Sequence, residues 1–365
     1  MGRPIVIGLT GAIGTGKSNV LQTLMSLGAD GFDADRIAHK LMEPGELAHA
    51  RVVAAFGSDI LGPDGRIDRR RLGIRAFGEE GALARLESLI HPAVVEVLRG
   101  LVTASTAPAV AIEAIKLLES GLSRTMCDRV WVTTCSRRQQ NARLATSRGM
   151  SVEQVRRRLA AQMPAPEMAA RADRVIDTGG TISATRLVVL GAWVELGLPL
   201  PAPQIRTATL EDAEGIAAVL NSVVREGTHS VISRTFTPSQ ECAFLRGLPK
   251  RARLIVAQVG EAVAGFQVVE PYAAYTGAMD HVATLGTYVA GPVRGAGLGR
   301  RMSEETFTHV RAAGYEKIVV HVRADNRGAR DFYAALGFRE AGRLERQARV
   351  AGGSVDVLLL ERFLG

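Results

Sequence analysis

The stretch from Pro4 to Gly28 constrains the fold more than any other part of this chain. An apolar run, PIVIGLT, has the composition of a β-strand and leads directly into GAIGTGKS, which fits the pattern G-x-x-x-x-G-K-[ST]. A helical stretch, NVLQTLMSLG, follows. In such a unit, small residues let backbone N–H groups turn toward phosphate oxygens, and the helix adds its free N–H groups and positive dipole end. The order therefore predicts a phosphate-binding loop between a strand and a helix.

Two side chains of this loop add chemistry to it. Lys17 supplies a compact cation for the β- and γ-phosphates of a nucleotide, and Ser18 can ligate Mg²⁺. We therefore predict ATP and Mg²⁺ as ligands, with Ser18 as the metal-binding residue. The residues expected to contact the nucleotide are Gly11, Ala12, Ile13, Gly14, Thr15, Gly16, Lys17, Ser18 and Asn19.

The length and composition of the chain suit two domains. A chain of 365 residues with 47% hydrophobic residues can bury two cores. The Pro-rich segment LGLPLPAPQ, residues 196–204, is the expected linker, which places the domains at residues 1–200 and 201–365. No stretch reaches the ~20 apolar residues of a membrane-spanning helix, and the N-terminus lacks an export signal. Together with three cysteines expected to be free thiols, this predicts a cytoplasmic protein without a membrane partner.

The charge of the chain points to small anionic ligands. The net charge is +8, from 45 Lys and Arg residues against 37 Asp and Glu residues. The sequence contains no basic stripe interleaved with aromatic residues and no nucleic-acid recognition motif. We therefore expect small-molecule partners and no nucleic acid, while the sequence leaves the oligomeric state open.

Hydrophobic periodicity predicts an α/β fold for both halves. In the first half, strands are expected at 4–10, 108–115, 129–134 and 174–177. Helices are expected between them at 17–28, 69–77, 80–89, 92–103, 137–148, 151–162 and 182–195. This alternation predicts a parallel sheet covered by helices on both faces. In the second half, a mixed sheet is expected, with strands at 252–259, 262–270, 283–290 and 317–323, helices at 298–313 and 327–336, and a final hairpin.

A series of short motifs follows the phosphate loop in the first half. Asp33 and Asp35 form a D-x-D pair, DGRIDRRRLG spans 64–73, LIHPAV spans 89–94, and Gln140 precedes Arg143 by three residues. Together with the loop, these motifs resemble the dephospho-CoA kinases over nearly all of residues 1–195. The resemblance implies a P-loop kinase with a parallel sheet and a helical lid. It also implies ATP-dependent phosphorylation of the ribose 3′-hydroxyl of dephospho-CoA, which gives CoA.

The same resemblance suggests roles for single residues. Asp33 matches the acidic residue that follows the second strand in the family, and it is expected to accept the hydroxyl proton. Asp35 fits better as the N-cap of the next helix. Lys17 and Arg143 are expected to stabilise charge on the transferred phosphoryl group, with Arg143 on the lid. For Glu113, holding a metal-bound water and being a solvated strand end stay equally open.

Three other positions carry structural expectations. His91, before Pro92, is expected to start a helix rather than to act as a catalyst. Lys116 stands where the related kinases have an apolar residue, and Thr178 stands where Asn commonly follows the sequence Ile-Asp. These two departures could alter contacts to the nucleotide or the acceptor.

The second half carries a phosphate-binding pattern of another kind. Within TLGTYVAGPVRGAGLGRRM, residues 294–299 fit R-x-x-G-x-G at a helix start, so backbone N–H groups could surround a pyrophosphate. With VRADNRGARDFYAALGF, residues 322–338, this pattern resembles the GNAT superfamily of acetyl-CoA-dependent N-acetyltransferases over roughly 205–361. The resemblance implies acetyl-CoA contacts from Val289, Arg294, Gly295, Ala296, Gly297, Leu298, Gly299, Arg300 and Asn326.

Catalytic roles in the second half also follow from this resemblance. The strand before the loop should splay from its neighbour and offer backbone hydrogen bonds at Val289 to the acetyl-pantetheine arm. Tyr333 matches the tyrosine near the leaving thiolate and is expected to act as a general acid, with a core aromatic as the alternative. Asn326 either contacts the cofactor or caps the following helix. Candidates for the base are Asp280, His281 and a water held near Thr287.

The sequence therefore predicts a bifunctional enzyme. The first half would make CoA from ATP and dephospho-CoA, and the second would acetylate an unidentified amine with acetyl-CoA. Two alternatives stay open: another small-molecule P-loop kinase, or a kinase whose second domain is a non-catalytic sensor of CoA or acetyl-CoA.

Overall fold

The computed structural model describes residues 3–120, 124–160, 162–350 and 352–364. Its contacts divide the chain into two compact units, Met1–Gly180 and Thr181–Gly365, each of which is described by itself. In the described residues, no helix is both long and apolar enough to cross a membrane. Ala161, which falls in the helix expected at 151–162, lies outside the described residues.

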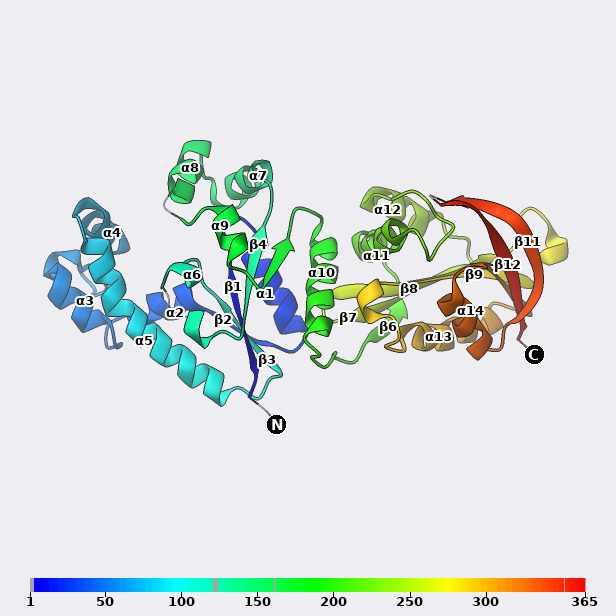
Figure 1. The fold of residues 1–365 in the computed structure, drawn as a ribbon, viewed down its shortest axis with the longest axis horizontal. Coiled ribbons are helices and arrows are strands. Elements are labelled where there is room, and N and C mark those ends of the chain that lie inside the picture. The colour runs from blue at the N-terminus through cyan, green and yellow to red at the C-terminus, as the bar shows by residue number, and fades with distance from the viewer. Residues whose placement is uncertain (1–2, 121–123, 161, 351, 365) are drawn as a thin grey trace. The chain divides into compact units, whose positions relative to one another are not determined.

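The first unit is built on a five-stranded parallel sheet with the order β2-β3-β1-β4-β5 and helices on both faces (Figure 1). Its strands are β1 (Ile5–Thr10), β2 (Asp30–Asp33), β3 (Ala109–Glu113), β4 (Arg129–Thr134) and β5 (Arg174–Asp177). The central strands are buried apolar runs, as expected when both faces of a parallel sheet are covered. Because all strands run in one direction, their carboxyl ends share one edge, which is where the phosphate loop begins. The predicted α/β class is confirmed.

The helices predicted for the first unit appear in the expected order with one clear difference, and the structure adds further helices that were not predicted. They are α1 (Lys17–Ser26), α2 (Ala34–Leu41), α3 (His49–Phe56), α4 (Arg69–Gly78), α5 (Ala82–Ala104), α6 (Leu117–Ser120), α7 (Arg137–Arg148), α8 (Val152–Ala160) and α9 (Ala165–Ala170), with 3₁₀ turns at η1 (Ser58–Ile60) and η2 (Arg124–Met126). The expected helix start at His91 is wrong, because α5 runs through Pro92 without ending. Proline removes one helical hydrogen bond, but Ile90, Val94 and Leu98 are buried along this helix, and their packing outweighs that loss.

The second unit is built on a seven-stranded mixed sheet with the order β11-β12-β10-β9-β8-β7-β6. Its strands are β6 (Gln204–Thr207), β7 (Arg253–Val259), β8 (Ala262–Pro271), β9 (Val282–Val289), β10 (Lys317–Arg323), β11 (Arg339–Val350) and β12 (Gly353–Phe363). Its helices are α10 (Ile182–Glu195), α11 (Ala213–Glu226), α12 (Pro238–Gly247), α13 (Leu298–Ala312) and α14 (Arg327–Ala335), with short turns at η3 (Leu210–Asp212), η4 (Gly277–Met279) and η5 (Gly291–Val293). The predicted mixed sheet is confirmed.

Strands β9 and β10 form the parallel pair of this sheet, and they separate along their length. Their pairing runs only from Val282–Lys317 to Thr284–Val319, although β9 continues to Val289 and β10 continues to Arg323. The two strands therefore part at their carboxyl ends, as expected for the strand before the second loop.

Helix α10 belongs to the second unit. It packs against α11, β8 and η5, and the nearest atoms that a Cβ on Gly191 would meet are those of Pro292, at 3.0 Å. The Arg186 guanidinium pairs with Glu261 at 2.7 Å, and the Ser183 N–H donates to the Glu214 carboxylate at 2.8 Å. The division at residue 180 thus differs from the division proposed at residue 200 by the length of this helix.

Candidate functional sites

The phosphate loop after β1 has a backbone that only glycine can follow at three points. Gly11, Gly14 and Gly16 have φ angles of 147°, 79° and 82°. A Cβ on Gly11 would lie 2.4 Å from the Thr133 hydroxyl, and a Cβ on Gly14 would lie 2.9 Å from the Leu144 side chain. The glycines therefore give the loop both its turn and its close packing. Helix α1 starts directly after Gly16, so its first free N–H groups face the loop.

Lys17 is held inside this loop. Its side chain is only 7% exposed, and its Nζ donates hydrogen bonds to the carbonyls of Gly11 at 2.9 Å and Ala12 at 3.4 Å. Burial lowers the pKa of Lys17, while the neighbouring carboxylates of Glu113 and Asp35 act in the opposite direction. The loop therefore carries one cation directed at its own carbonyls, in the position expected for a phosphate ligand.

Carboxylates from two neighbouring strands meet beside Lys17. Asp33 ends β2 and pairs in register with Glu113, which ends β3. The Ser18 hydroxyl donates to the Glu113 carboxylate at 3.4 Å. Burial raises the pKa of Glu113, and the pKa of Asp35 is raised by desolvation and by the nearby Asp33 charge. Glu113 is only 9% exposed, so the alternative that it is a solvated strand end is wrong.

The N-cap of α2 is Asp33 and not Asp35, which corrects the sequence expectation. One Asp33 carboxylate oxygen accepts from the Arg36 N–H at 3.0 Å. Asp35 lies in the first turn of the helix, and its carboxylate instead accepts a hydrogen bond from the Ile115 backbone. The other oxygen of Asp33 has no hydrogen bond among the described residues, so the cap leaves it able to act as a base.

The lid helix α7 contacts the loop from the other side. The Gln140 amide donates to the Ile13 carbonyl at 3.1 Å, and the Ile13 N–H donates to the Gln162 side chain at 3.1 Å. Arg143 donates to the hydroxyl of Thr178 at 3.1 Å and to its carbonyl at 2.6 Å. Arg143 thus contacts Thr178, and its predicted role toward the transferred phosphoryl group stays a prediction.

Thr178 connects the loop and the lid, which the sequence did not show. Its hydroxyl is within 2.7 Å of the Thr15 carbonyl and 3.1 Å of Arg143, and its side chain is 3% exposed. The signal available in the sequence was only its departure from the common Asn. At Lys116, where the related kinases have an apolar residue, the ammonium pairs with the Glu87 carboxylate at 2.5 Å, which accounts for a lysine at this position.

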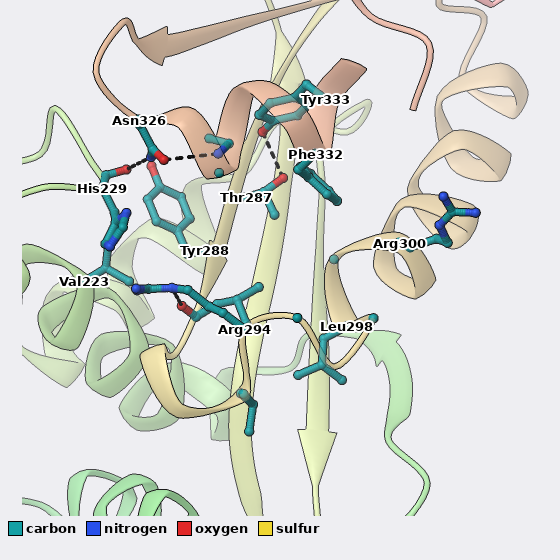
Figure 2. A pocket seen from close by; sticks show the side chains of 17 residues that line it. Val223, His229, Thr287, Tyr288, Arg294, Leu298, Arg300, Asn326, Phe332 and Tyr333 are labelled. Atoms are coloured by element: carbon teal, nitrogen blue, oxygen red, sulfur yellow. Dashed lines mark hydrogen bonds between the residues drawn. The ribbon is translucent and has the colours of Figure 1, made fainter. Parts of the chain in front are cut away.

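A cavity of about 490 Å³ opens in the second unit where β9 and β10 separate (Figure 2). Eight of the nine residues predicted to contact acetyl-CoA line it: Val289, Arg294, Gly295, Gly297, Leu298, Gly299, Arg300 and Asn326. Ala296 is the exception; it is exposed, and its N–H donates to the Val293 carbonyl at 3.3 Å. Lining residues that sequence reasoning missed include Val223, His229, Tyr288 and Phe332. Val223 lies on α11 and His229 in the loop that follows it, while Tyr288 and Phe332 are aromatic residues that no motif singled out.

The loop before α13 presents backbone groups to this cavity. Gly297 is the N-cap of α13 with φ 79°, so the first N–H groups of that helix are free. Arg294 donates to the Val289 carbonyl at 3.1 Å and pairs with Glu226 at 2.6 Å. The carbonyl of Val289 is therefore already engaged by Arg294, and the predicted contact to the pantetheine arm stays a prediction.

Tyr333 and Asn326 come from α14 and the turn before it. The Tyr333 hydroxyl contacts the Thr287 hydroxyl at 3.0 Å, and burial raises the pKa of Tyr333, so it stays protonated near neutral pH (Figure 2). Tyr333 also packs edge-on against Phe338, so it is both a core aromatic and a cavity residue. Asn326 caps α14 by accepting from the Ala329 N–H at 3.1 Å.

The candidate bases of the second site are not equally placed. Thr287 lines the cavity, but Asp280 and His281 do not. The His281 carbonyl accepts from Glu316 and Lys317 at the far end of β9 from the cavity. Of these candidates, only the position of Thr287 fits a role at the reacting atoms.

Comparisons with known proteins found matches for both halves of the chain. Residues 5–184 match the family model of dephospho-CoA kinase, and residues 223–338 match that of the acetyltransferase (GNAT) family. Curated relatives include the dephospho-CoA kinases of Geobacter metallireducens, 42% identical over 194 residues, and Thermobifida fusca, 40% identical over 190 residues. Each alignment covers 52% of this chain, and they cover 96% and 95% of those relatives.

Solved structures also resemble parts of the chain. TT1252 from Thermus thermophilus is 30% identical with a TM-score of 0.48, and covers 54% of this chain and 100% of its own. An N-acetyltransferase from Staphylococcus aureus is 20% identical with a TM-score of 0.43, and covers 45% and 100%. With the kinase relatives covered almost completely at about 40% identity, the chain belongs to the dephospho-CoA kinase family, and it carries a GNAT acetyltransferase domain in its second half.

Proposed function

We propose that the first unit transfers a phosphoryl group from ATP to the ribose 3′-hydroxyl of dephospho-CoA. The observation that carries this proposal is the meeting of the phosphate loop, Asp33 and Glu113 at one edge of the parallel sheet. Positioning and charge neutralisation supply most of the catalysis in phosphoryl transfer, and this edge offers groups for both. The dephospho-CoA kinase relatives supply the identity of the acceptor.

Each group at this edge has a role in that reaction. The free oxygen of Asp33 takes the proton of the attacking hydroxyl, while its other oxygen stays on the helix cap. Lys17 and Arg143 stabilise charge on the phosphoryl oxygens from the loop and the lid. Gln140 of the lid helix and Gln162 after α8 both hydrogen bond to Ile13, so they hold the phosphate loop in place for the nucleotide.

The residues present fit Mg²⁺. Ser18 and Glu113 bring oxygen donors within 3.4 Å of each other beside the loop, which suits a hard cation that also keeps waters and substrate phosphates as ligands. When bound, Mg²⁺ would neutralise charge on the β- and γ-phosphates.

The experiment for the kinase compares Lys17→Ala with the full-length protein in an assay of CoA formation from ATP, Mg²⁺ and dephospho-CoA. We expect a loss of about 10²-fold or more, because Lys17 is a preorganised charge in a buried loop. The matched control is Lys250→Ala, which removes an exposed lysine from the second unit. An unchanged rate in Lys17→Ala would contradict the proposal, and turnover of other alcohols but not dephospho-CoA would indicate a different kinase.

We propose further that the second unit binds acetyl-CoA in the cavity between β9 and β10 and acetylates an amine. The helix start at Gly297 suits the pyrophosphate, and Tyr333 lies within the same cavity as a neutral hydroxyl for the leaving sulfur. This support comes from the cavity and from the match to the GNAT family.

The experiment for the second unit is calorimetry of acetyl-CoA with full-length Gly297→Val. A branched side chain at φ 79° strains the turn and crowds the phosphate position, so affinity should fall at least about tenfold. Gly314→Val is the matched control, because Gly314 has φ 75° beyond the other end of α13. Equal affinity in both variants would place the cofactor elsewhere. A panel of amines with labelled acetyl-CoA then separates an enzyme from a sensor that binds without transfer.

A further inference from the structure

The mixed sheet of the second unit has two faces, and the proposed cofactor groups use one of them. Helices α13 and α14 pack on the face that carries Val269. Helices α11 and α12 pack on the opposite face, which carries Val268. Because side chains alternate along a strand, Glu270 on β8 shares this opposite face with Tyr288 on β9. Tyr288 also lines the cavity where β9 and β10 separate, so this face is open to the cavity there.

The ring of Tyr288 lies across Gly286 on the same strand. A Cβ on Gly286 would lie 3.1 Å from the ring and 3.5 Å from the hydroxyl oxygen, so glycine leaves room for the ring. Glu270 pairs in register with Thr284, two residues before Gly286. Glu270 is therefore a diagonal neighbour of Gly286 on this face, a separation that long side chains span. The hydroxyl of Tyr288 and the carboxylate of Glu270 thus belong to one small region of the sheet.

A second carboxylate reaches this region from α12. Glu241 on that helix is buried, with 5% of its surface exposed. In the described part of the chain, neither Glu241 nor Glu270 has a hydrogen-bond donor or a cation for its carboxylate, and burial raises the pKa of both. Burial also raises the pKa of Tyr288, and the charges of both carboxylates add to that effect. Buried charges are normally paired, so two such carboxylates suit a cation brought by a ligand.

We propose that Glu241 and Glu270 form the acceptor subsite of the second unit, and that the acceptor is an amine with two positive charges. One ammonium group carries the reacting nitrogen, and the other balances the second carboxylate. Amines that carry a carboxylate of their own are disfavoured, because like charges repel in a site with little water. This inference rests on the proposed acetyl-CoA site, which lies beside the same strand.

The two carboxylates also suit the chemistry of the transfer. An ammonium group must lose one proton before its nitrogen can attack the thioester carbon, and a carboxylate whose pKa is raised by burial is a suitable base. As the N–C bond forms and the C–S bond breaks, the nitrogen gives up a second proton and the leaving sulfur takes one up. The carboxylic acid then returns its proton to water.

The test uses the full-length protein and three amines with the same four-carbon chain. They are 1,4-diaminobutane, butylamine and 4-aminobutanoate. In thermal scans, 1,4-diaminobutane should raise the unfolding transition that ATP does not raise, and 4-aminobutanoate should leave it unchanged. With labelled acetyl-CoA, kcat/KM should be highest for 1,4-diaminobutane, intermediate for butylamine, and about 10²-fold or more lower for 4-aminobutanoate, since a like charge replaces an opposite one.

The variants test the two carboxylates. Glu241→Gln and Glu270→Gln should each reduce the preference for 1,4-diaminobutane by about tenfold or more, as for the loss of a charged hydrogen bond. Glu305→Gln removes an exposed carboxylate from α13 and should keep the preference. Kinase activity and acetyl-CoA affinity report whether each variant is folded.

The outcomes separate this subsite from the proposed activity. An equal preference in the wild type and both glutamine variants, or faster transfer to 4-aminobutanoate, would overturn the subsite. Absence of both the thermal shift and the transfer with 1,4-diaminobutane would overturn it as well. A thermal shift that is lost in Glu241→Gln, without acetyl transfer in the wild type, would support the subsite and overturn the proposed acetyltransferase activity.

Discussion

Replacing Thr178 by valine should loosen the connection between the phosphate loop and the lid of the kinase unit. Valine keeps the shape of threonine but removes the hydroxyl that accepts from Arg143 at 3.1 Å and faces the Thr15 carbonyl at 2.7 Å. The hydroxyl also lies 3.0 Å from the Thr134 carbonyl, but that carbonyl keeps the Thr178 N–H as a donor, so the Thr15 carbonyl is the one that loses its contact. The second bond of Arg143, to the Thr178 carbonyl at 2.6 Å, survives the substitution.

The size of the effect follows from those contacts. A hydrogen bond from a charged donor contributes about 1.5–3 kcal/mol, and a buried carbonyl left without a donor costs a similar amount. Because Arg143 keeps one bond, we expect a loss of about 2–3 kcal/mol in the free energy of unfolding. For a unit of this size that is a fall of roughly 4–12 °C in Tm. If about half of this energy is needed to hold Arg143 in the transition state, kcat falls about tenfold.

The assay is a thermal scan of the full-length protein together with the rate of CoA formation. The transition of the kinase unit is the one that ATP raises, because ligand binding stabilises only the unit that binds. Thr178→Ser is the control, since it keeps the hydroxyl and should stay near the wild type in both measurements. If Thr178→Val matched Thr178→Ser in Tm and kcat, the role given to this hydroxyl would be refuted.

Two other variants test the acidic edge of the kinase. Asp33→Asn can still cap α2, so stability and ATP affinity should change little while kcat falls by about 10²-fold or more; a variant that kept its turnover would exclude Asp33 as the base. Burial raises the pKa of Glu113, so its contribution to stability is full below the ordinary Glu pKa and is lost as pH rises through the higher folded-state pKa. Glu113→Gln should therefore flatten the pH dependence of the ATP-responsive unfolding transition above the ordinary Glu pKa, measured with urea, and an unchanged slope would count against the burial argument.

Elements with strong local signals were predicted at or near their observed bounds. Helix α7 spans the expected 137–148, where Ser136 and Gln139 form a capping box, and β10 spans the expected 317–323. Hydrophobic periodicity missed strand β2, because its sequence, DGFD, has almost no apolar pattern; only the family resemblance implied a strand before Asp33. Helix α12 was also missed, although Thr237 and Gln240 form a capping box that could have revealed it.

The site residues also differ in whether neighbouring residues in the sequence reveal their role. The phosphate loop and the Gly297 turn are continuous in sequence, and their glycines need the positive φ angles they have, so the motifs locate them. Thr178 and Glu241 act through partners on other elements, so nothing in their own neighbourhood reveals a role. Even Asp33 was assigned correctly to its strand end but not to its cap, since the helix begins two residues earlier than the expected cap at Asp35 implied.

Helix α10 gives the two halves of this protein an unusual kind of attachment. Relatives that are kinases alone align with this chain over about 190 residues, yet here the contacts of α10 belong to the unit that follows. A chain cut in the Pro-rich segment after α10 would leave this helix covalently on the kinase and noncovalently on the acetyltransferase unit through Glu214, Glu261 and Pro292. The two fragments of such a cleaved protein would stay associated through α10. A fusion of the second half to another protein would need its junction before Ile182 to keep this helix with its contacts.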